Sequence, residues 1–306
     1  MKVCPLCGSK ETNLYCENSD FLFETTEEKF KLIRCKKCDL IFMEKKFNPQ
    51  ELAKFYPKDY WEEKERKTEN LYRKFVIYHH IFFVKKYLKN GNSILDIGCG
   101  DGLFLNELNR KKRYKAYGLE GFNKNVIAKN FTLIPEKIEN VEKIPEEFDV
   151  ITAFHVIEHL PDPDSFLEKV NKFLKENGKV ILQLPNTDSI QAKIFKKRWT
   201  GIDIPRHLMN YNPENLRILL KKHNFEIERI CHFSLRDSSP SIVSSLIPRF
   251  NPVYLNIKGR NDLFSTVKKF IYLIFVLSFQ PISFLEALFR KGGIIFCVAK
   301  KKKEKK

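Results

Sequence analysis

Short apolar runs alternate with amphipathic stretches over the central part of the chain, residues 93–233. Runs such as F-D-V-I-T-A-F (148–154) have the length and composition of buried strands, and the stretches between them carry apolar residues at helical spacing. Predicted strands cover 94–97, 114–119, 148–154, 179–184 and 225–233, and predicted helices cover 103–108, 123–130, 163–175 and 213–223. This alternation predicts an α/β fold with a parallel sheet and helices on both faces.

The segments on either side of this core follow different patterns. Residues 1–45 contain short alternating stretches that are typical of a ribbon, and residues 46–92 show helical patterns rich in aromatic residues. Residues 234–291 form an apolar insertion, and residues 292–306 contain a last apolar strand and a basic tail. We therefore expect five parts: a ribbon, a helical linker, the core (93–233), the insertion and a final strand with its tail.

The insertion contains an apolar run, residues 270–289, for which several structures are open. A membrane span needs about 20 uninterrupted apolar residues, and Gln280-Pro281 is expected to divide this run. A soluble strand follows soon afterwards, which also disfavours a span. The run could instead form an interfacial or lid helix, or pack against the core. Basic residues that would suit an anionic membrane surface flank the run: Lys268, Lys269, Arg290 and Lys291.

The composition indicates a folded, strongly basic protein. The 306 residues are 43% hydrophobic, which excludes a disordered chain, and they carry a net charge of +17. Such a charge favours an anionic partner such as nucleic acid, anionic lipid or a phosphorylated substrate, although the lysine-rich tail supplies part of it. No apolar signal segment is visible near the N-terminus, so we expect a cytoplasmic protein, peripheral on the inner face of the cytoplasmic membrane if it binds lipid.

Two C-x-x-C pairs near the N-terminus predict a structural metal site. Each pair places two thiolates on one tight turn, and two such turns facing each other give the tetrahedral sulfur coordination that zinc prefers. About 45 residues cannot bury enough apolar surface to fold without such support. A redox role fits poorly because two pairs are present without a thioredoxin-like pattern. The predicted ligands are Cys4, Cys7, Cys35 and Cys38.

The segment S-I-L-D-I-G-C-G-D-G-L-F (93–104) places a glycine-rich turn directly after a predicted strand. The Walker pattern is missing, and Leu103 stands where the dinucleotide fingerprint needs glycine or alanine. Asp96 would repel a pyrophosphate but suits a cation. S-adenosylmethionine (SAM) carries an amino group and a sulfonium but no phosphate, and Glu120 can accept hydrogen bonds from its ribose hydroxyls. These features favour SAM over a dinucleotide.

The motifs L-D-I-G-C-G-D-G (95–102) and F-D-V-I-T-A-F-H-V-I-E-H-L-P-D-P (148–163) resemble the core of class I SAM-dependent methyltransferases, in the branch of ubiquinone-type and sugar methyltransferases. The segments around the cysteine pairs and R-W-T-G-I-D-I-P-R-H-L (198–208) resemble a subgroup with an N-terminal zinc ribbon. Members of that subgroup are commonly associated with methylation of sugars or cell-envelope glycans. The resemblance implies a Rossmann-like seven-stranded sheet, in which the segment 292–300 is the final, antiparallel strand.

The resemblance also implies which residues hold SAM. It assigns Glu120 to the ribose and places Phe122 near the adenine. The family's G-D-[LI] segment at the adenine edge corresponds here to 136–138, which ends in Ile138 and lacks the usual carboxylate, so Glu139 or a backbone carbonyl would have to replace it. The remaining residues implied at the cofactor are Asp96, Gly98, Cys99, Gly100, Gly102, Phe154 and His155.

Methyl transfer to a hydroxyl or an acidic carbon needs a base, and histidine suits that role near neutral pH. His207 is the predicted base, and its neighbour Arg206 is predicted to bind a phosphate or carboxylate of the acceptor. His159, next to Glu158, follows the fourth strand of the core. This pair either contributes to the site, as its neighbourhood does in ubiquinone-type relatives, or only caps the following turn.

The expected activity is O- or C-methylation of a sugar or another small acceptor related to the cell envelope. A lipid-linked acceptor would explain the apolar insertion and the positive charge together. One alternative is a zinc-ribbon ribosomal-RNA methyltransferase, although no N-P-P-[FY] motif follows the fourth strand. A membrane-associated protein that binds SAM without turnover is a second alternative.

Overall fold

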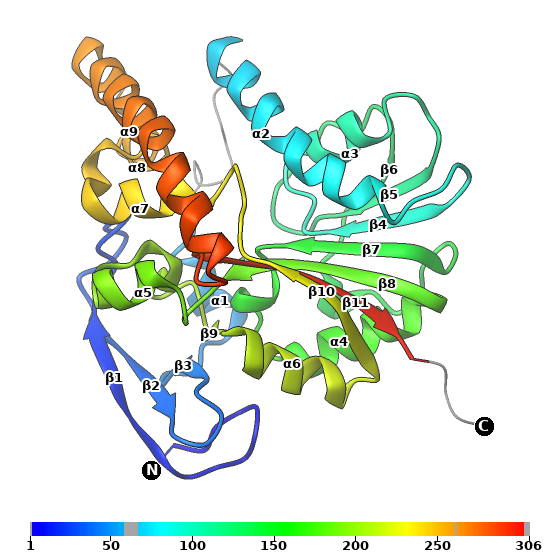
Figure 1. Cartoon of the computed structure of the whole chain (residues 1–306), viewed down its shortest axis with the longest axis horizontal. Coiled ribbons are helices and arrows are strands. Elements are labelled where there is room, and N and C mark those ends of the chain that lie inside the picture. The colour runs from blue at the N-terminus through cyan, green and yellow to red at the C-terminus, as the bar shows by residue number, and fades with distance from the viewer. Residues whose placement is uncertain (1, 58–66, 261, 303–306) are drawn as a thin grey trace.

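The computed structural model describes residues 2–57, 67–260 and 262–302. Parts of the predicted linker (58–66) and of the basic tail (303–306) lie outside the described residues. A seven-stranded sheet forms the centre of the molecule, in the order β10-β11-β8-β7-β4-β5-β6 (Figure 1). Its strands are β4 (Ser93–Ile97), β5 (Lys115–Leu119), β6 (Thr132–Ile134), β7 (Phe148–Phe154), β8 (Leu174–Pro185), β10 (Phe225–Cys231) and β11 (Ile294–Lys301).

β11 runs antiparallel to both of its neighbours, and the strands from β8 to β6 pair in parallel. The predicted Rossmann-like sheet with a final antiparallel strand is therefore confirmed. Because β4 and β7 are parallel neighbours, the turns that follow Ile97 and Phe154 lie side by side at one edge of the sheet.

Helices cover both faces of this sheet, as the alternating pattern predicts. α2 (Lys67–Lys85) and α3 (Leu103–Leu108) pack on one face, where Ile81 and Leu105 are buried with Val150 of β7. α4 (Pro163–Phe173) and α6 (Pro213–Lys222) lie on the other face, where Leu167 and Leu219 join the larger core. The two apolar layers hold the strand ends, and therefore the turns after them, in fixed positions.

The predicted helix at 123–130 is wrong. Residues 121–131 form an irregular loop followed by the short strand β6. The Asn106 side chain accepts hydrogen bonds from the backbone N–H groups of Lys129 and Asn130, and its amide donates to the Ile127 carbonyl. These contacts occupy the backbone groups that a helix would pair within itself.

The N-terminal residues form a second, smaller sheet of four strands. β1 (Thr12–Asn18), β2 (Phe30–Cys35) and β3 (Ile41–Met43) pair in antiparallel order. The fourth strand is β9 (Met209–Asn210), which comes from the chain after the central β8 and pairs with β3. α1 (Pro49–Ala53) follows this sheet. The short strand β9 therefore connects the ribbon directly to the segment that carries Arg206 and His207.

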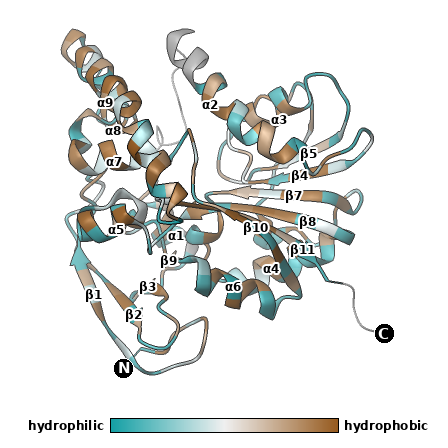
Figure 2. Cartoon of the chain, viewed as in Figure 1, coloured by the Kyte–Doolittle hydropathy of each residue, from teal (hydrophilic) through white to brown (hydrophobic). Residues whose placement is uncertain are grey.

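The insertion is helical and contains α7 (Ser238–Leu246), α8 (Pro252–Ile257) and the long α9 (Leu263–Leu288), and a short α5 (Ile190–Phe195) lies near it. The expected break at Gln280-Pro281 is wrong, because α9 continues through Pro281. Pro281 is on the exposed side, and the Ser283 hydroxyl donates to the Gln280 carbonyl, 2.9 Å away. By length and composition α9 is able to cross a membrane, and it is hydrophobic along most of its length (Figure 2).

Candidate active site

The glycine-rich turn between β4 and α3 has the open backbone that a bound nucleoside needs. Gly98, Gly100 and Gly102 all have positive φ angles. A Cβ added at Gly98 would meet the Val156 side chain at 2.8 Å, whereas one at Gly100 would meet nothing within 4 Å. The space beside Gly100 is therefore open to a ligand that approaches the backbone closely.

Two carboxylates border this turn. The Glu120 carboxylate accepts hydrogen bonds from the backbone N–H groups of Gly100 (3.0 Å) and Phe122 (2.8 Å). Asp96 is buried at the end of β4 and accepts a hydrogen bond from the Thr152 hydroxyl at 2.6 Å. Burial favours the uncharged acid and raises the pKa of Asp96 to about 7. An open glycine turn edged by carboxylates, with no basic side chain aimed at a phosphate among these contacts, fits the cationic SAM.

The predicted adenine region is at the exposed side of the same edge. Phe122 is 56% exposed, and the Lys137 ammonium lies 4.4 Å from the centre of its ring. Ile138 is buried and begins a short 3-10 turn. Cys99 is buried with Phe104 and Leu105 of α3. The roles of these three residues toward SAM stay predictions.

At the end of β7 the chain bends sharply and places His155 between two acids. His155 has a φ of +55°, and its Nδ1 lies 3.1 Å from Glu158 Oε1. Its Nε2 lies 3.6 Å from Oδ1 of Asp237, which comes from the start of the insertion. Burial disfavours the charged imidazole, but Asp237 and Glu158 outweigh that effect and raise the pKa of His155 to about 9. His155 is therefore held protonated at neutral pH. The preceding Phe154 packs edge-on against Phe104.

Glu158, His159 and His207 form a second group beside His155. One ligand atom from each of the three lies within 4.8 Å of the others, an arrangement that could also hold a divalent cation. The two imidazole rings meet edge to face at 4.6 Å. Burial and repulsion by His207 lower the pKa of His159 to about 4, so this ring is neutral. The structure therefore brings Glu158 and His207 together, although they are 49 positions apart in the sequence.

Two features of this group suit it to bind a polar ligand. Glu158 is 1% exposed, and its Oε2 has no hydrogen-bond partner among the residues that the structure describes. His207 has its Nδ1 2.9 Å from the Gly201 carbonyl, so Nδ1 is the nitrogen that donates and Nε2 is not used in that bond. A buried carboxylate oxygen without a partner is costly, which indicates that a ligand or a proton completes this group.

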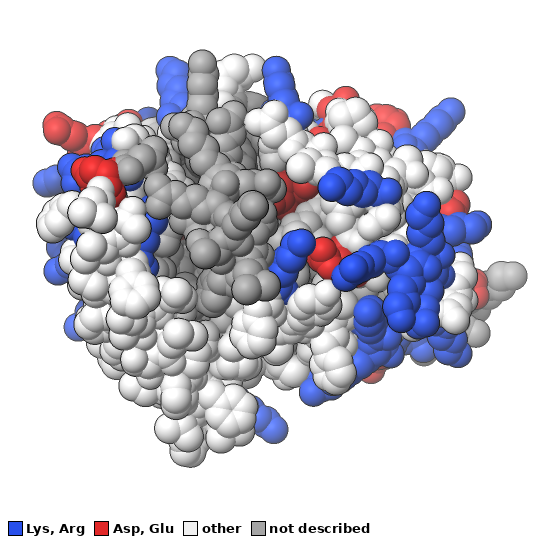
Figure 3. Space-filling model, turned by 90° about the horizontal axis from the view of Figure 1, so that it is seen from above, with Lys and Arg blue, Asp and Glu red and all other residues white. Residues whose placement is uncertain are grey.

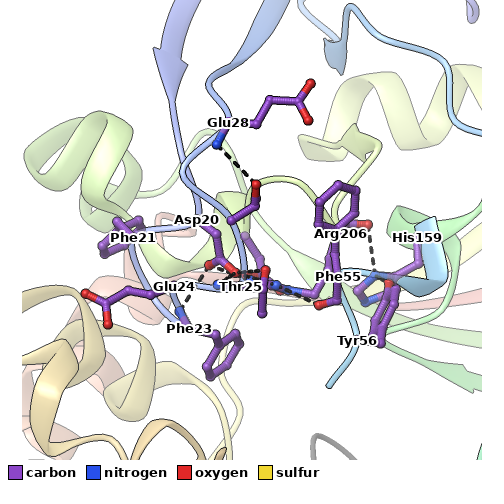
Figure 4. A network of polar contacts seen from close by, with 12 residues as sticks. Asp20, Phe21, Phe23, Glu24, Thr25, Glu28, Phe55, Tyr56, His159 and Arg206 are labelled. Atoms are coloured by element: carbon purple, nitrogen blue, oxygen red, sulfur yellow. Dashed lines mark hydrogen bonds and ion pairs between the residues drawn. The ribbon is translucent and has the colours of Figure 1, made fainter. Parts of the chain in front are cut away.

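The predicted role of Arg206 does not fit the structure. Its guanidinium is fully buried and makes paired hydrogen bonds to Asp20 (2.8 Å to each oxygen) and to Asp203 (2.6 and 2.9 Å), as Figure 4 shows for Asp20. Two carboxylates therefore neutralise it, and it also donates to the Phe55 carbonyl. Arg206 joins the ribbon to the loop before His207 rather than offering its charge to an acceptor.

Two residues at the site were not predicted. The Tyr56 hydroxyl lies 2.9 Å from His159 Nδ1 (Figure 4), and Asp237 closes the far side of His155. Both come from segments outside the core motifs, and an Asp in a polar loop has no sequence signal that separates it from its neighbours. Although burial favours its protonated form, the charges of Arg236 and His155 hold the pKa of Asp237 well below its ordinary value.

The four predicted cysteine ligands meet in the N-terminal ribbon. The Sγ atoms of Cys4 and Cys38 lie 3.5 Å apart, those of Cys7 and Cys35 lie 3.6 Å apart, and all four are within 4.8 Å of one another. Burial raises the pKa of Cys4 to about 11, so without a cation this thiol stays protonated at neutral pH. Four converging sulfurs are the donor set of structural zinc. Cys16 is not part of the cluster.

Comparison with known proteins identifies the family. The model of a family described as "Methyltransferase domain" matches residues 63–230. The ubiquinone biosynthesis O-methyltransferase of Pelagibacter ubique is 28% identical over 171 residues, which are 50% of this chain and 70% of that protein.

Solved structures share the fold at low sequence identity. The [4+2]-cyclase SpnF has a TM-score of 0.50 and 16% identity, over 73% of this chain and 80% of its own. The Haemonchus contortus phosphoethanolamine N-methyltransferase 2, solved with S-adenosylhomocysteine, also has a TM-score of 0.50, with 17% identity over 74% of this chain and 53% of its own. The family match covers the turn at Gly98–Gly102, Glu120 and the group after β7, and the chain therefore belongs to the methyltransferase domain family, as a class I SAM-dependent methyltransferase.

Proposed function

We propose that this enzyme methylates a hydroxyl oxygen of a small acceptor, with His207 as the base. The observation that carries the proposal is the unpaired Glu158 Oε2 beside two imidazoles, at the same edge of the sheet as the glycine turn. The name of the Pelagibacter relative, an O-methyltransferase, supports oxygen over carbon as the target. The resemblance of the ribbon segments to glycan-methylating proteins supports a sugar or envelope-related acceptor.

Each residue of the site has its own role in the proposed reaction. SAM supplies the methyl group: the acceptor oxygen attacks the methyl carbon, the carbon–sulfur bond breaks, and S-adenosylhomocysteine leaves. The hydroxyl proton moves to Nε2 of His207, whose other nitrogen is fixed by the Gly201 carbonyl. The carboxylate of Glu158 stabilises the imidazolium that forms. Both ring nitrogens of His155 face acids, Nδ1 toward Glu158 and Nε2 toward Asp237, so His155 positions the Glu158 carboxylate beside His207.

The test is transfer of labelled methyl from SAM to lipid, glycan and RNA fractions of the source cell, followed by rates on the fraction that accepts it. His207→Ala should lower the rate by about 10²–10⁴-fold, the usual contribution of a general base. Glu158→Gln should also lower the rate, because the imidazolium that forms loses its counter-charge. Binding of S-adenosylhomocysteine, measured by calorimetry, should stay unchanged in both. His223→Gln is the matched control, because His223 pairs with Asp164 near the end of α6, away from this group.

Each other outcome excludes part of the proposal. Full activity in His207→Ala would remove His207 as the base. Label in the RNA fraction alone would support an RNA methyltransferase instead. Binding of S-adenosylhomocysteine without transfer to any of the three fractions would support a protein that binds the cofactor without turnover.

A further inference from the structure

The outward side of α9 has the polarity of a lipid-facing surface. Large apolar side chains are exposed along its whole length, which is about 39 Å for 26 residues at the usual rise. Phe270 is 63% exposed, Leu277 55%, and Leu288 63%. The others that are more than 40% exposed are Leu263, Phe264, Val267, Ile274, Phe275, Ile282, Phe284 and Leu285.

The charged residues of α9 lie on its inner or lateral side, which reverses the pattern of an ordinary surface helix. The segment 263–289 contains three of them. Lys268 lies over the rings of Phe250 and Phe264, and Lys269 donates to the Asn256 side chain. Glu286 is 7% exposed and accepts a hydrogen bond from Gln191. Seen from above, the lower left of the molecule shows a broad area without charged side chains, with charged groups above it (Figure 3).

The inner side of α9 is fixed to the protein. Tyr272 and Val276 are buried, and hydrogen bonds join α9 to α7 between the hydroxyls of Ser244 and Tyr272 and from Ser239 to the Val276 carbonyl, each 2.8 Å long. Only five residues, 289–293, separate the end of α9 from β11 in the central sheet. A spanning helix would lose these contacts and pull on the sheet, so the structure favours a helix that lies in the plane of an interface.

A lipid surface fits this face better than a protein does. Protein interfaces carry about one hydrogen bond per 100–200 Å², whereas the outward side of α9 offers few polar groups. The Ser278 hydroxyl donates back to the Ile274 carbonyl, and the Thr266 hydroxyl donates to the Asp262 carbonyl. Acyl chains need no such partners. Arg260 before α9 and Arg290 after it are exposed, and with the net charge of +17 they favour anionic headgroups and disfavour a second copy of the chain.

We propose that α9 is a membrane-docking helix, which lies in the headgroup region of an anionic bilayer with Phe270, Leu277 and their exposed neighbours among the acyl chains. Asp237, beside His155, directly precedes α7, and α7 packs against α9. The docked enzyme would therefore hold its site near the bilayer surface. Lipid binding does not depend on turnover, so it can be tested separately from the proposed methylation.

The test is flotation of the full-length protein with vesicles of phosphatidylcholine alone or mixed with phosphatidylglycerol in equal parts. The wild type should float with the mixed vesicles and much less with the neutral ones. Phe270→Glu/Leu277→Glu should weaken that binding at least about tenfold. Ile218→Glu is the matched control, because Ile218 is an exposed apolar residue on α6, and it should bind like the wild type. Binding of S-adenosylhomocysteine checks that each variant is folded.

Four results would overturn the proposal. The wild type would fail to float with anionic vesicles, or the double variant would bind them as well as the wild type. Bound protein that resists alkaline carbonate would indicate a spanning helix. A dimer that the double variant abolishes, without vesicle binding by the wild type, would indicate that this face joins two copies of the chain.

Discussion

At the scale of single residues, the environment of His155 decides what the site can do. Its positive φ turns the imidazole toward Glu158 and Asp237, and these two acids raise its pKa to about 9 against the effect of burial. The pKa of His155 in the folded protein is therefore above the ordinary value of 6.5. Protonation of this ring contributes its full stabilisation of the fold below about pH 6.5. That stabilisation is lost as the pH rises through about 9.

Asp237→Asn should lower the pKa of His155 toward 6.5, because it removes one of the two charges that hold the proton. The measurement is an NMR titration of the histidine rings. The difference in unfolding free energy between wild type and variant should also shrink above pH 9, where His155 is neutral in both. Asp164→Asn is the control, since Asp164 pairs with His223 instead. An unchanged His155 titration in Asp237→Asn would contradict this account.

The residues that the sequence predicted at the site share one property: they belong to a local motif. The glycines of 98–102 and Glu158-His159 follow strands whose apolar pattern is strong, so their place at the edge of the sheet could be predicted. Asp237 could not, because nothing local shows that it returns to His155. Arg206 was assigned the wrong partner for the same reason, since Asp20 is 186 positions away.

At the scale of elements, the pattern of apolar residues predicts where helices and strands form better than it predicts where they are interrupted. β7 and α3 have the predicted bounds, 148–154 and 103–108. The segment 123–130 failed because the Asn106 side chain pairs with its backbone, and the break at Pro281 failed because α9 continues through a proline on its exposed side. For 123–130 the deciding contacts are tertiary and leave no periodic signal in the sequence.

The ribbon is the element for which the predicted metal matters most. Its sheet consists of short strands, and Cys35 and Cys38 hold the turn between β2 and β3. If the cluster holds zinc, Cys35→Ser should abolish bound zinc, measured by mass spectrometry, and lower the thermal midpoint, because binding of a structural metal contributes to folding. Cys16→Ser should keep one zinc per chain, since Cys16 is outside the cluster. Equal zinc content in the two variants would contradict the assignment of these ligands.

At the scale of the whole molecule, the loop 199–208 connects three parts that lie far apart in the sequence. Trp199 donates to the Ser241 hydroxyl of the insertion at 3.0 Å, and Arg206 binds Asp20 of the ribbon. His207 lies beside Glu158 of the core. We expect the three parts to unfold together, because breaking the Arg206 contacts leaves buried acids without a partner.

Arg206→Ala should lower the free energy of unfolding by about 3–5 kcal/mol, the usual cost of leaving buried acids unpaired. Arg34→Ala, which breaks an exposed pair with Asp39, should cost about 0–1 kcal/mol.

In the wild type, zinc release and loss of helical circular dichroism should occur at the same urea concentration, whereas in Arg206→Ala zinc should leave first. If Arg206→Ala were as stable as the wild type but no longer bound an acidic acceptor, the guanidinium would be a ligand group and the ion pair with Asp20 would not join the parts of the molecule.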